Sequence, residues 1–172
     1  KPFTVIATQN PTGAAGTQLL PDSQMDRFTI RLSLGYPSAK DEMAMVLSRQ
    51  GQDPMATLTR LMTPQELQQL QEVVANTHIS NDVVSYIVRL IGATRNHAQI
   101  LRGASPRATL SVTAMAKAVA QLRGRDYVVP KDVQEVFVEA VAHRVQVAPG
   151  QEETARQLLS HLLTAIPAPK LV

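Results

Sequence analysis

The chain has 172 residues, of which 44% are hydrophobic and only 3% are aromatic, and its formal net charge is +3. The few aromatic rings and the mild, scattered charge argue against a nucleic-acid surface built on base stacking or on a basic arm. The chain has no cysteine, which excludes disulfides and thiolate metal sites and fits a cytoplasmic protein, and no apolar stretch is long enough to span a membrane.

Residues 1–36 predict a strand, a loop, a short helix and a second strand. Residues 4–8 are almost continuously apolar, as in a strand that is covered on both faces. The stretch "NPTGAAGT" (10–17) predicts a loop, and Pro21 opens a short helix. Alternating apolar residues over 28–34 predict the second strand. Because a buried strand needs neighbours and the chain has no initiator methionine, we expect this part to be the end of a larger α/β core.

From residue 37 onward the pattern is helical. Capping residues, prolines and acidic residues indicate helix starts at Ser38 with Asp41, Thr63 with Pro64 and Glu66, Ser80, Ser105 with Pro106, and Pro130. The helical periodicity predicts these inward-facing stripes: Met43, Val46 and Leu47; Leu67, Leu70 and Val74; Val83, Ile87, Leu90, Ile91 and Thr94; Ala108, Val112, Met115, Val119 and Leu122; Val133, Val136 or Phe137, Ala140 and Val141. Gly124 ends the fourth helix, and residues 151–166 predict one more. We therefore expect a mainly α fold, a helical bundle preceded by a small strand–helix–strand remnant of an α/β core.

The sequence contains no recognisable catalytic centre of its own. Its four histidines are scattered along the chain, which does not favour a zinc site, and no phosphate loop of the form G-x-x-x-x-G-K-[ST] occurs. Asn10 is a candidate because it follows the first predicted strand, at the edge where ligands of open α/β sheets bind. Its amide could orient an attacking water, or Asn10 and Pro11 could form an ordinary turn.

Two arginines are further candidates. Arg27 follows the short helix, where the helix dipole favours a cation; the alternative is an arginine that reaches a phosphate on a neighbouring subunit. Arg107 lies in the first turn of the helix that Ser105 and Pro106 begin, where the dipole disfavours a cation by on the order of several tenths of a kcal/mol. It is either solvated or binds a phosphate together with the free N–H groups of that turn.

Several motifs occur in order along the chain: "ATQNP" (7–11), "QMDRF" (24–28), "GYPS" (35–38), "GASPRA" (103–108) and "LRGRDYVVPKDV" (122–133). With these motifs the chain closely resembles, over nearly its whole length, the C-terminal portion of the MoxR family of AAA+ ATPases, and more distantly the magnesium-chelatase ATPase subunits. The resemblance implies a role for each candidate residue. Asn10 would be the sensor-1 residue that positions water or senses the γ-phosphate, Arg27 the arginine finger for the adjacent subunit, and Arg107 the sensor-2 contact to the nucleotide of its own subunit.

The resemblance also implies a division of the chain, a reaction and partners. Residues 1–36 would be the end of the nucleotide-binding core and residues 37–172 the helical lid. The intact protein would bind ATP with Mg²⁺, hydrolyse it in a homo-oligomeric ring, expected to be a hexamer, and remodel or activate client proteins, often ones with von Willebrand A-type domains. The family's phosphate loop and Mg²⁺-binding acidic motif do not occur in residues 1–172, so we expect this chain alone to be inactive and to hold no cofactor.

The sequence departs from the family pattern in two places. The usual "EGTYPLPEAQLDRF" is "AGTQLLPDSQMDRF" here, so ring contacts made elsewhere by the residues replaced at Ala15, Gln18 and Asp22 are in doubt. Val129 stands where a capping threonine is expected, which should weaken the helix that follows by about 1 kcal/mol. The alternative function is a non-enzymatic helical binding module with a basic patch of Arg102, Arg107, Arg123 and Arg125, for which nucleic acid is a candidate ligand.

Overall fold

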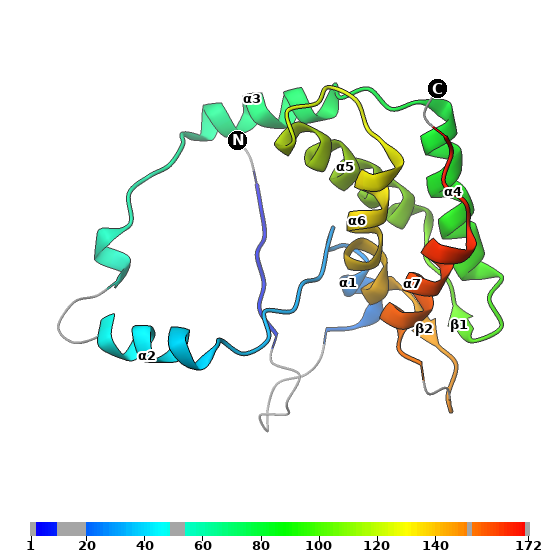
Figure 1. The fold of residues 1–172 in the computed structure, drawn as a ribbon, viewed down its shortest axis with the longest axis horizontal. Coiled ribbons are helices and arrows are strands. Elements are labelled where there is room, and N and C mark those ends of the chain that lie inside the picture. The colour runs from blue at the N-terminus through cyan, green and yellow to red at the C-terminus, as the bar shows by residue number, and fades with distance from the viewer. Residues whose placement is uncertain (1–2, 10–19, 49–53, 151–152, 171–172) are drawn as a thin grey trace.

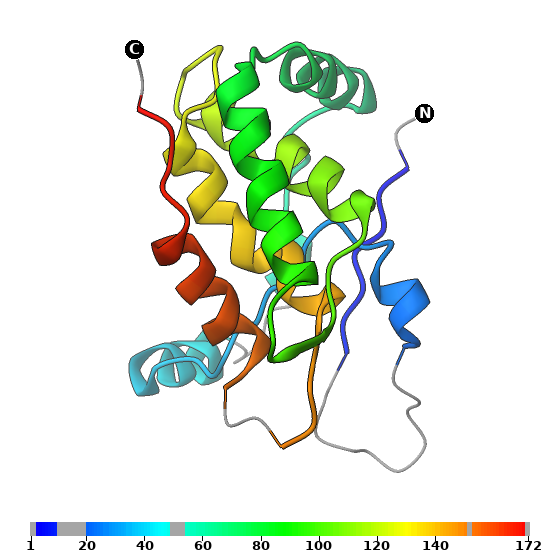
Figure 2. The ribbon, with the colours of Figure 1, turned by 90° about the vertical axis from the view of Figure 1, so that its right-hand side faces the viewer.

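The computed structural model describes residues 3–9, 20–48, 54–150 and 153–170, and the fold is mainly helical, as predicted. Its elements are, in chain order, α1 (Asp22–Met25), α2 (Ala39–Ser48), the 3-10 helix η1 (Pro54–Thr57), α3 (Pro64–Ala75), α4 (Asn81–Arg95), β1 (Ile100–Arg102), α5 (Pro106–Leu122), α6 (Pro130–Val141), the 3-10 helix η2 (Ala142–Arg144), β2 (Gln146–Val147) and α7 (Ala155–Ala165). Helices α4 to α7 pack together around one core and are called the bundle below (Figures 1 and 2).

The bundle buries most of the residues that helical periodicity predicts. All five stripe residues of α4 are buried, as are Val133, Val136, Phe137, Ala140 and Val141 of α6, and α7 adds Leu158, Leu159 and Leu162. Helix α5 differs from the prediction, because it turns Ala108, Val112, Ala116 and Ala120 to the core and leaves Leu122 88% exposed. Leu122 is the last residue of α5. The small residues at intervals of four let the backbone of α5 lie close to its neighbours.

The predicted helix starts are present. Ser38 and Asp41 hydrogen-bond to each other before α2, Thr63 and Glu66 form a complete capping box before α3, and the Ser80 hydroxyl accepts from the Val83 amide. Gly124 follows α5 with φ +69, the left-handed conformation that favours glycine at a helix end.

The expected weakness at the start of α6 is offset by an acidic residue. Val129 offers no side-chain acceptor to the helix, but the carboxylate of Asp132 in the first turn accepts from the Val129 amide at 2.9 Å. The same carboxylate is buried and receives two hydrogen bonds from Arg125, at 2.9 and 2.6 Å. Half of a capping box is therefore built, and it is anchored by an ion pair.

The two predicted strands of the N-terminal part are not formed among the described residues. Residues 3–9 and 28–34 pair with no strand, and their side chains are largely exposed, including Ile6 at 91% and Leu34 at 97%. A strand takes its backbone hydrogen bonds from a neighbouring strand, and no such neighbour lies beside either segment in the described part of the chain. The predicted loop 10–17, with Ala15, and Gln18 lie outside the described residues.

Helix α2 is also less buried than predicted. It lies apart from the bundle (Figure 1), and Met43, Val46 and Leu47, predicted to face inward, are 67%, 60% and 63% exposed. In α3, which packs on α5, Leu67 and Val74 are half-buried and Leu70 is exposed. The amphipathic pattern of α2 thus marks a face that no described residue covers.

A two-stranded antiparallel sheet was not predicted. Strand β1 pairs with β2, with Ile100 opposite Val147 and Arg102 opposite Gln146. This sheet pairs the connection before α5 with the segment after η2, so the two ends of the α5–α6 hairpin are hydrogen-bonded to each other at one end of the bundle. No helix of the described residues is long and apolar enough to cross a membrane.

Candidate functional site

The segment after α1 docks against the end of the bundle where α5 begins. Figure 1 shows α1 beside the lower end of α6, where η2 follows. The Asp26 carboxylate accepts hydrogen bonds from the Ser105 hydroxyl at 3.0 and 3.1 Å, and Arg107 Nη1 lies 3.6 Å from it. Farther along, the Arg31 amide donates to the carbonyl of Glu139 in α6 at 3.0 Å. One short segment, residues 26–31, is thus joined to the bundle by side-chain and backbone bonds.

Arg144 forms the buried centre of this junction. Its side chain is 1% exposed, and it donates to Phe28 O at 2.6 Å, to Ser111 Oγ at 2.8 Å and to Asp26 Oδ1 at 3.3 Å. Burial lowers the pKa of the Arg144 guanidinium, and the neighbouring Asp26 carboxylate acts in the opposite direction. Asp26 is the charge that compensates the buried cation, which is why it lies inside the junction and not in solvent.

His143 lies beside the same contacts. Its Nε2 is 3.0 Å from Phe28 O and 3.2 Å from Arg144 Nε, while Nδ1 is buried with no hydrogen-bond partner among the described residues. Burial lowers the pKa of His143 below its usual value of about 6.5, so the ring is neutral at pH 7. No group of three or more His, Asp or Glu in the described part of the chain could hold a metal ion.

The predicted site residues are placed as follows. Asn10 lies outside the described residues. Arg27 is exposed, and no described residue forms an ion pair with its guanidinium, although its two neighbours in sequence are both held by the junction. Arg107 is at the second position of α5 with a side chain that is 60% exposed. Arg107 thus lies beside the Asp26 carboxylate, and Arg27 directly follows Asp26 in the sequence.

The start of α5 is unusual in its capping. Ser105 is the N-cap, as predicted, but its hydroxyl makes no bond to the helix and donates to Asp26 instead. Pro106 has no amide hydrogen, and the Ala108 amide already bonds the Ser105 carbonyl. No side-chain cap therefore competes for the first turn of α5, where Arg107 is placed.

The sequence reasoning missed Arg144, His143 and the pairing role of Asp26. A signal for Arg144 was present: it stands in "EAVAHRVQVA" (139–148), a mostly apolar stretch with no acid at helical spacing after Glu139. A buried arginine of this kind needs a carboxylate from elsewhere in the chain, and nothing local names Asp26 as that partner.

The basic patch of the alternative function is not formed. Arg102 pairs with Asp22 at 2.5 Å, and Arg123 and Arg125 both pair with the buried Asp132. Arg107 and Arg123 stand at opposite ends of α5, about 24 Å apart along a helix of that length. Four arginines that are each beside a carboxylate and lie in two separate places do not make one surface for a polyanion.

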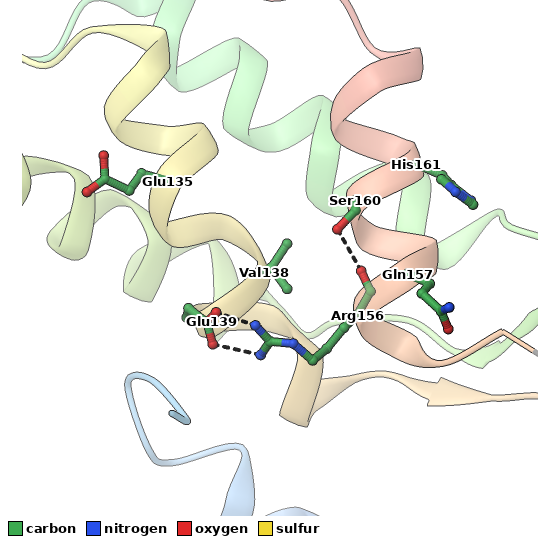
Figure 3. A pocket seen from close by; sticks show the side chains of 7 residues that line it. All are labelled: Glu135, Val138, Glu139, Arg156, Gln157, Ser160 and His161. Carbon is green, nitrogen blue, oxygen red and sulfur yellow. Dashed lines mark hydrogen bonds and ion pairs between the residues drawn. The ribbon is translucent and has the colours of Figure 1, made fainter. Parts of the chain in front are cut away.

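A shallow hollow lies elsewhere, between α6 and α7. It has a volume of about 390 Å³ and is lined by Glu135, Val138, Glu139, Arg156, Gln157, Ser160 and His161 (Figure 3). Figure 3 shows Arg156 turned to Glu139, with which it forms a two-pronged ion pair, so that these two charges neutralise each other. None of the predicted site residues lines it.

Comparison with known proteins gives two family matches. Residues 92–162 match the AAA lid domain, and residues 1–30 match the ATPase family associated with various cellular activities (AAA). The chain is 35% identical to the chaperone MoxR1 of Mycobacterium tuberculosis over 99% of its own length and 48% of that protein, and 33% identical to the uncharacterized protein YeaC of Bacillus subtilis over 98% and 53%. The protein MoxR of Paracoccus denitrificans is 29% identical over 96% of this chain and 56% of that protein.

A solved structure agrees with these matches. The crystal structure of a candidate ATPase from Cytophaga hutchinsonii superposes with a TM-score of 0.85 at 27% identity, covering 94% of this chain and 53% of that one. The chain thus spans about half the length of the relatives it matches. The fold is a helical AAA lid with a small remnant of the ATPase core, and the chain belongs to the MoxR-like AAA+ ATPases.

Proposed function

We propose that this chain is the sensing part of an ATP hydrolase that works as a ring of identical subunits, six in number, and remodels or activates client proteins in the cytoplasm. Residues 1–36 belong to the nucleotide-binding core and residues 37–172 to the lid, and ATP with Mg²⁺ binds between them in the full-length protein. The family matches and the relative named as a chaperone support this function. Clients with von Willebrand A-type domains follow from the family resemblance.

The observation that carries the proposal is the uncapped first turn of α5. Ser105 gives its hydroxyl to Asp26, and Arg107 stands in this turn with 60% of its side chain exposed. A helix N-terminus attracts an anion through its free amides and its dipole, and a guanidinium in the same turn adds a charged, forked donor. Arg107 therefore contacts a phosphate of the ATP that its own subunit binds.

Hydrolysis in such a site is an in-line attack of water on the γ-phosphate. Mg²⁺ supplies neutralisation of the phosphate charge when it is bound. Asn10 orients the attacking water, and Arg27 of one subunit stabilises the charge that develops on the phosphate bound by the next. The exposure of Arg27 next to a carboxylate that is already committed to Arg144 supports this role, because the guanidinium is available to a group outside its own chain.

The test compares two arginines of the same segment in the full-length protein. Arg27→Ala is expected to bind ATP within about twofold of the wild type and to lose turnover by a factor of roughly 10³ or more, the size typical of an arginine finger. Arg31→Ala is the control, since Arg31 is also exposed and lies four residues away. ATP binding is measured by titration and turnover by phosphate release. Normal turnover of the Arg27 variant would refute the proposed function.

A further inference from the structure

The side chain of Arg144 in η2 contacts both sequence neighbours of Arg27. Arg144 Nη1 contacts the side chain of Asp26 at 3.3 Å, and Nη2 donates to the backbone carbonyl of Phe28 at 2.6 Å. Asp26 and Phe28 stand immediately before and after Arg27 in the sequence. Since each residue has only two soft backbone dihedrals, fixing both neighbours leaves the backbone of Arg27 little freedom.

The Arg144 side chain is itself held by the bundle. Arg144 follows α6 directly in η2, is buried, and donates as well to Ser111 Oγ in α5 at 2.8 Å. The Ser105 hydroxyl holds Asp26 from the start of α5. The backbone that presents Arg27 is therefore attached to α5 and η2, while the Arg27 side chain stays exposed.

We propose that Arg144 is a positioning residue for Arg27, and that it holds the finger of one subunit at the height and direction needed to reach the nucleotide of the next. This inference rests on the proposed role of Arg27 across the subunit boundary. An arginine suits the task because its planar guanidinium offers five N–H donors in a fixed fork, enough for a carboxylate, a carbonyl and a hydroxyl together. A lysine at the same place keeps the charge beside Asp26 but cannot reproduce that geometry.

A purely structural role for Arg144 makes a different prediction. Damage to the bundle would disturb Arg107 and the nucleotide site of the same subunit. Loss of positioning would disturb the site of the neighbouring subunit and leave the variant's own site intact. The two possibilities separate in rings that contain two kinds of subunit.

The experiment uses full-length Arg144→Met and Arg144→Lys. Arg144→Met is expected to keep the KM for ATP within about twofold and to lose kcat by roughly 10²-fold, the size expected for a catalytic group displaced by about 1 Å. Arg144→Lys should show the same pattern with a smaller loss. Arg102→Gln is the matched control, since Arg102 of β1 also pairs with α1, through Asp22, but contacts neither neighbour of Arg27. Its kcat and KM should match the wild type.

The variants are then mixed with subunits that have a disabled phosphate loop and an intact Arg27. Sites on Arg144→Met subunits should regain turnover, because their neighbours now supply a well-placed finger. Arg27→Ala is mixed in the same way as a reference. If Arg27→Ala regains turnover and Arg144→Met does not, Arg144 acts within its own subunit and the positioning role is wrong while the proposed function stands.

Two other outcomes also decide the matter. Wild-type turnover by Arg144→Met would overturn the positioning role directly. Failure of Arg27→Ala itself to regain turnover, in rings shown to be mixed, would remove the action across the boundary on which both proposals depend. Thermal melts and ring assembly are checked first; if Arg144→Met does not assemble, Arg144→Lys decides the question through the same readouts.

Discussion

Replacement of Asp132 by asparagine tests the account of how α6 begins. The Asp132 side chain is fully buried, and its two oxygens receive two hydrogen bonds from Arg125, one from the Val129 amide at 2.9 Å and a longer contact from Arg123 at 3.4 Å. Asparagine has nearly the same shape, but its NH₂ group faces N–H donors in place of an acceptor oxygen. The buried carboxylate disappears and two arginines lose their common partner.

The size of the effect follows from these contacts. Breaking a buried ion pair by removing one partner costs about 3–5 kcal/mol, and a hydrogen bond to a charged group contributes about 1.5–3 kcal/mol. Arg125 and Arg123 are 23% and 43% exposed, so both can turn toward water and recover part of the loss. We therefore expect Asp132→Asn to lower the free energy of unfolding by about 3 kcal/mol, which shifts Tm by roughly 6–12 °C for a chain of this size.

The assay is urea and thermal unfolding of residues 1–172, with circular dichroism as the signal. Glu135→Gln is the control, because Glu135 of α6 also pairs with Arg123 but is 45% exposed. This substitution should change the free energy of unfolding by less than about 1 kcal/mol. A loss below about 1 kcal/mol for Asp132→Asn would refute the view that this carboxylate replaces the missing cap.

The same variant has a pH signature. Burial by itself would raise the pKa of Asp132, but the hydrogen bonds from Arg125 and the Val129 amide, together with both arginine charges, outweigh it and lower the pKa. A lowered pKa means that the carboxylate stabilises the fold above its unfolded-state pKa of about 3.9 and loses this effect as the pH falls through the folded-state value. The stability difference between wild type and Asp132→Asn should thus be constant near neutrality and shrink below about pH 4.

Two further predictions concern the turn before α5 and Arg107. Gly103→Ala would place a methyl group 2.6 Å from the Arg95 Cα and 2.7 Å from the Thr94 carbonyl oxygen, so it should lower the free energy of unfolding in urea by about 1–3 kcal/mol. Gly92→Ala, in open space on α4, should raise it by up to about 1 kcal/mol. Equal effects of the two substitutions would contradict the close approach at Gly103. Arg107→Ala should leave the stability of residues 1–172 within about 0.5 kcal/mol, because its pair with Asp26 is long and exposed, yet weaken ATP binding or turnover of the full-length protein by about 10- to 100-fold. A variant that melts early and handles nucleotide normally would show that Arg107 is structural.

The bundle was predictable because its information is local. Caps such as Ser80 before α4, and the apolar stripes of α4 and α6, are set by neighbours within one or two turns. The buried face of α5 was misjudged at Leu122, because periodicity does not show that this residue is the last of its helix. The strand predicted over 28–34 failed for a related reason: alternation indicates which residues suit a sheet, but pairing requires a second strand.

The site was predicted only in part. The family motifs single out Asn10, Arg27 and Arg107, and their roles remain predictions. The contacts that join Asp26 to Arg144 span 118 residues of sequence, and no local pattern connects two single charges over such a distance. Burial reveals the partnership, since an arginine that is 1% exposed must have a carboxylate nearby.

The turn that precedes α5 is hydrogen-bonded to the end of α4. The buried Thr94 hydroxyl donates to the Ile91 carbonyl at 2.7 Å and accepts from the Ala104 amide at 3.0 Å, while Arg95 Nε donates to the Ala104 carbonyl at 2.9 Å. Gly103 allows this contact, because no side chain separates the two backbones. The mechanical consequence is that the first turn of α5 follows any tilt of α4, a rod of 15 residues that is about 22 Å long. A partner that binds the N-terminal end of α4 would thereby shift Arg107 without approaching the nucleotide.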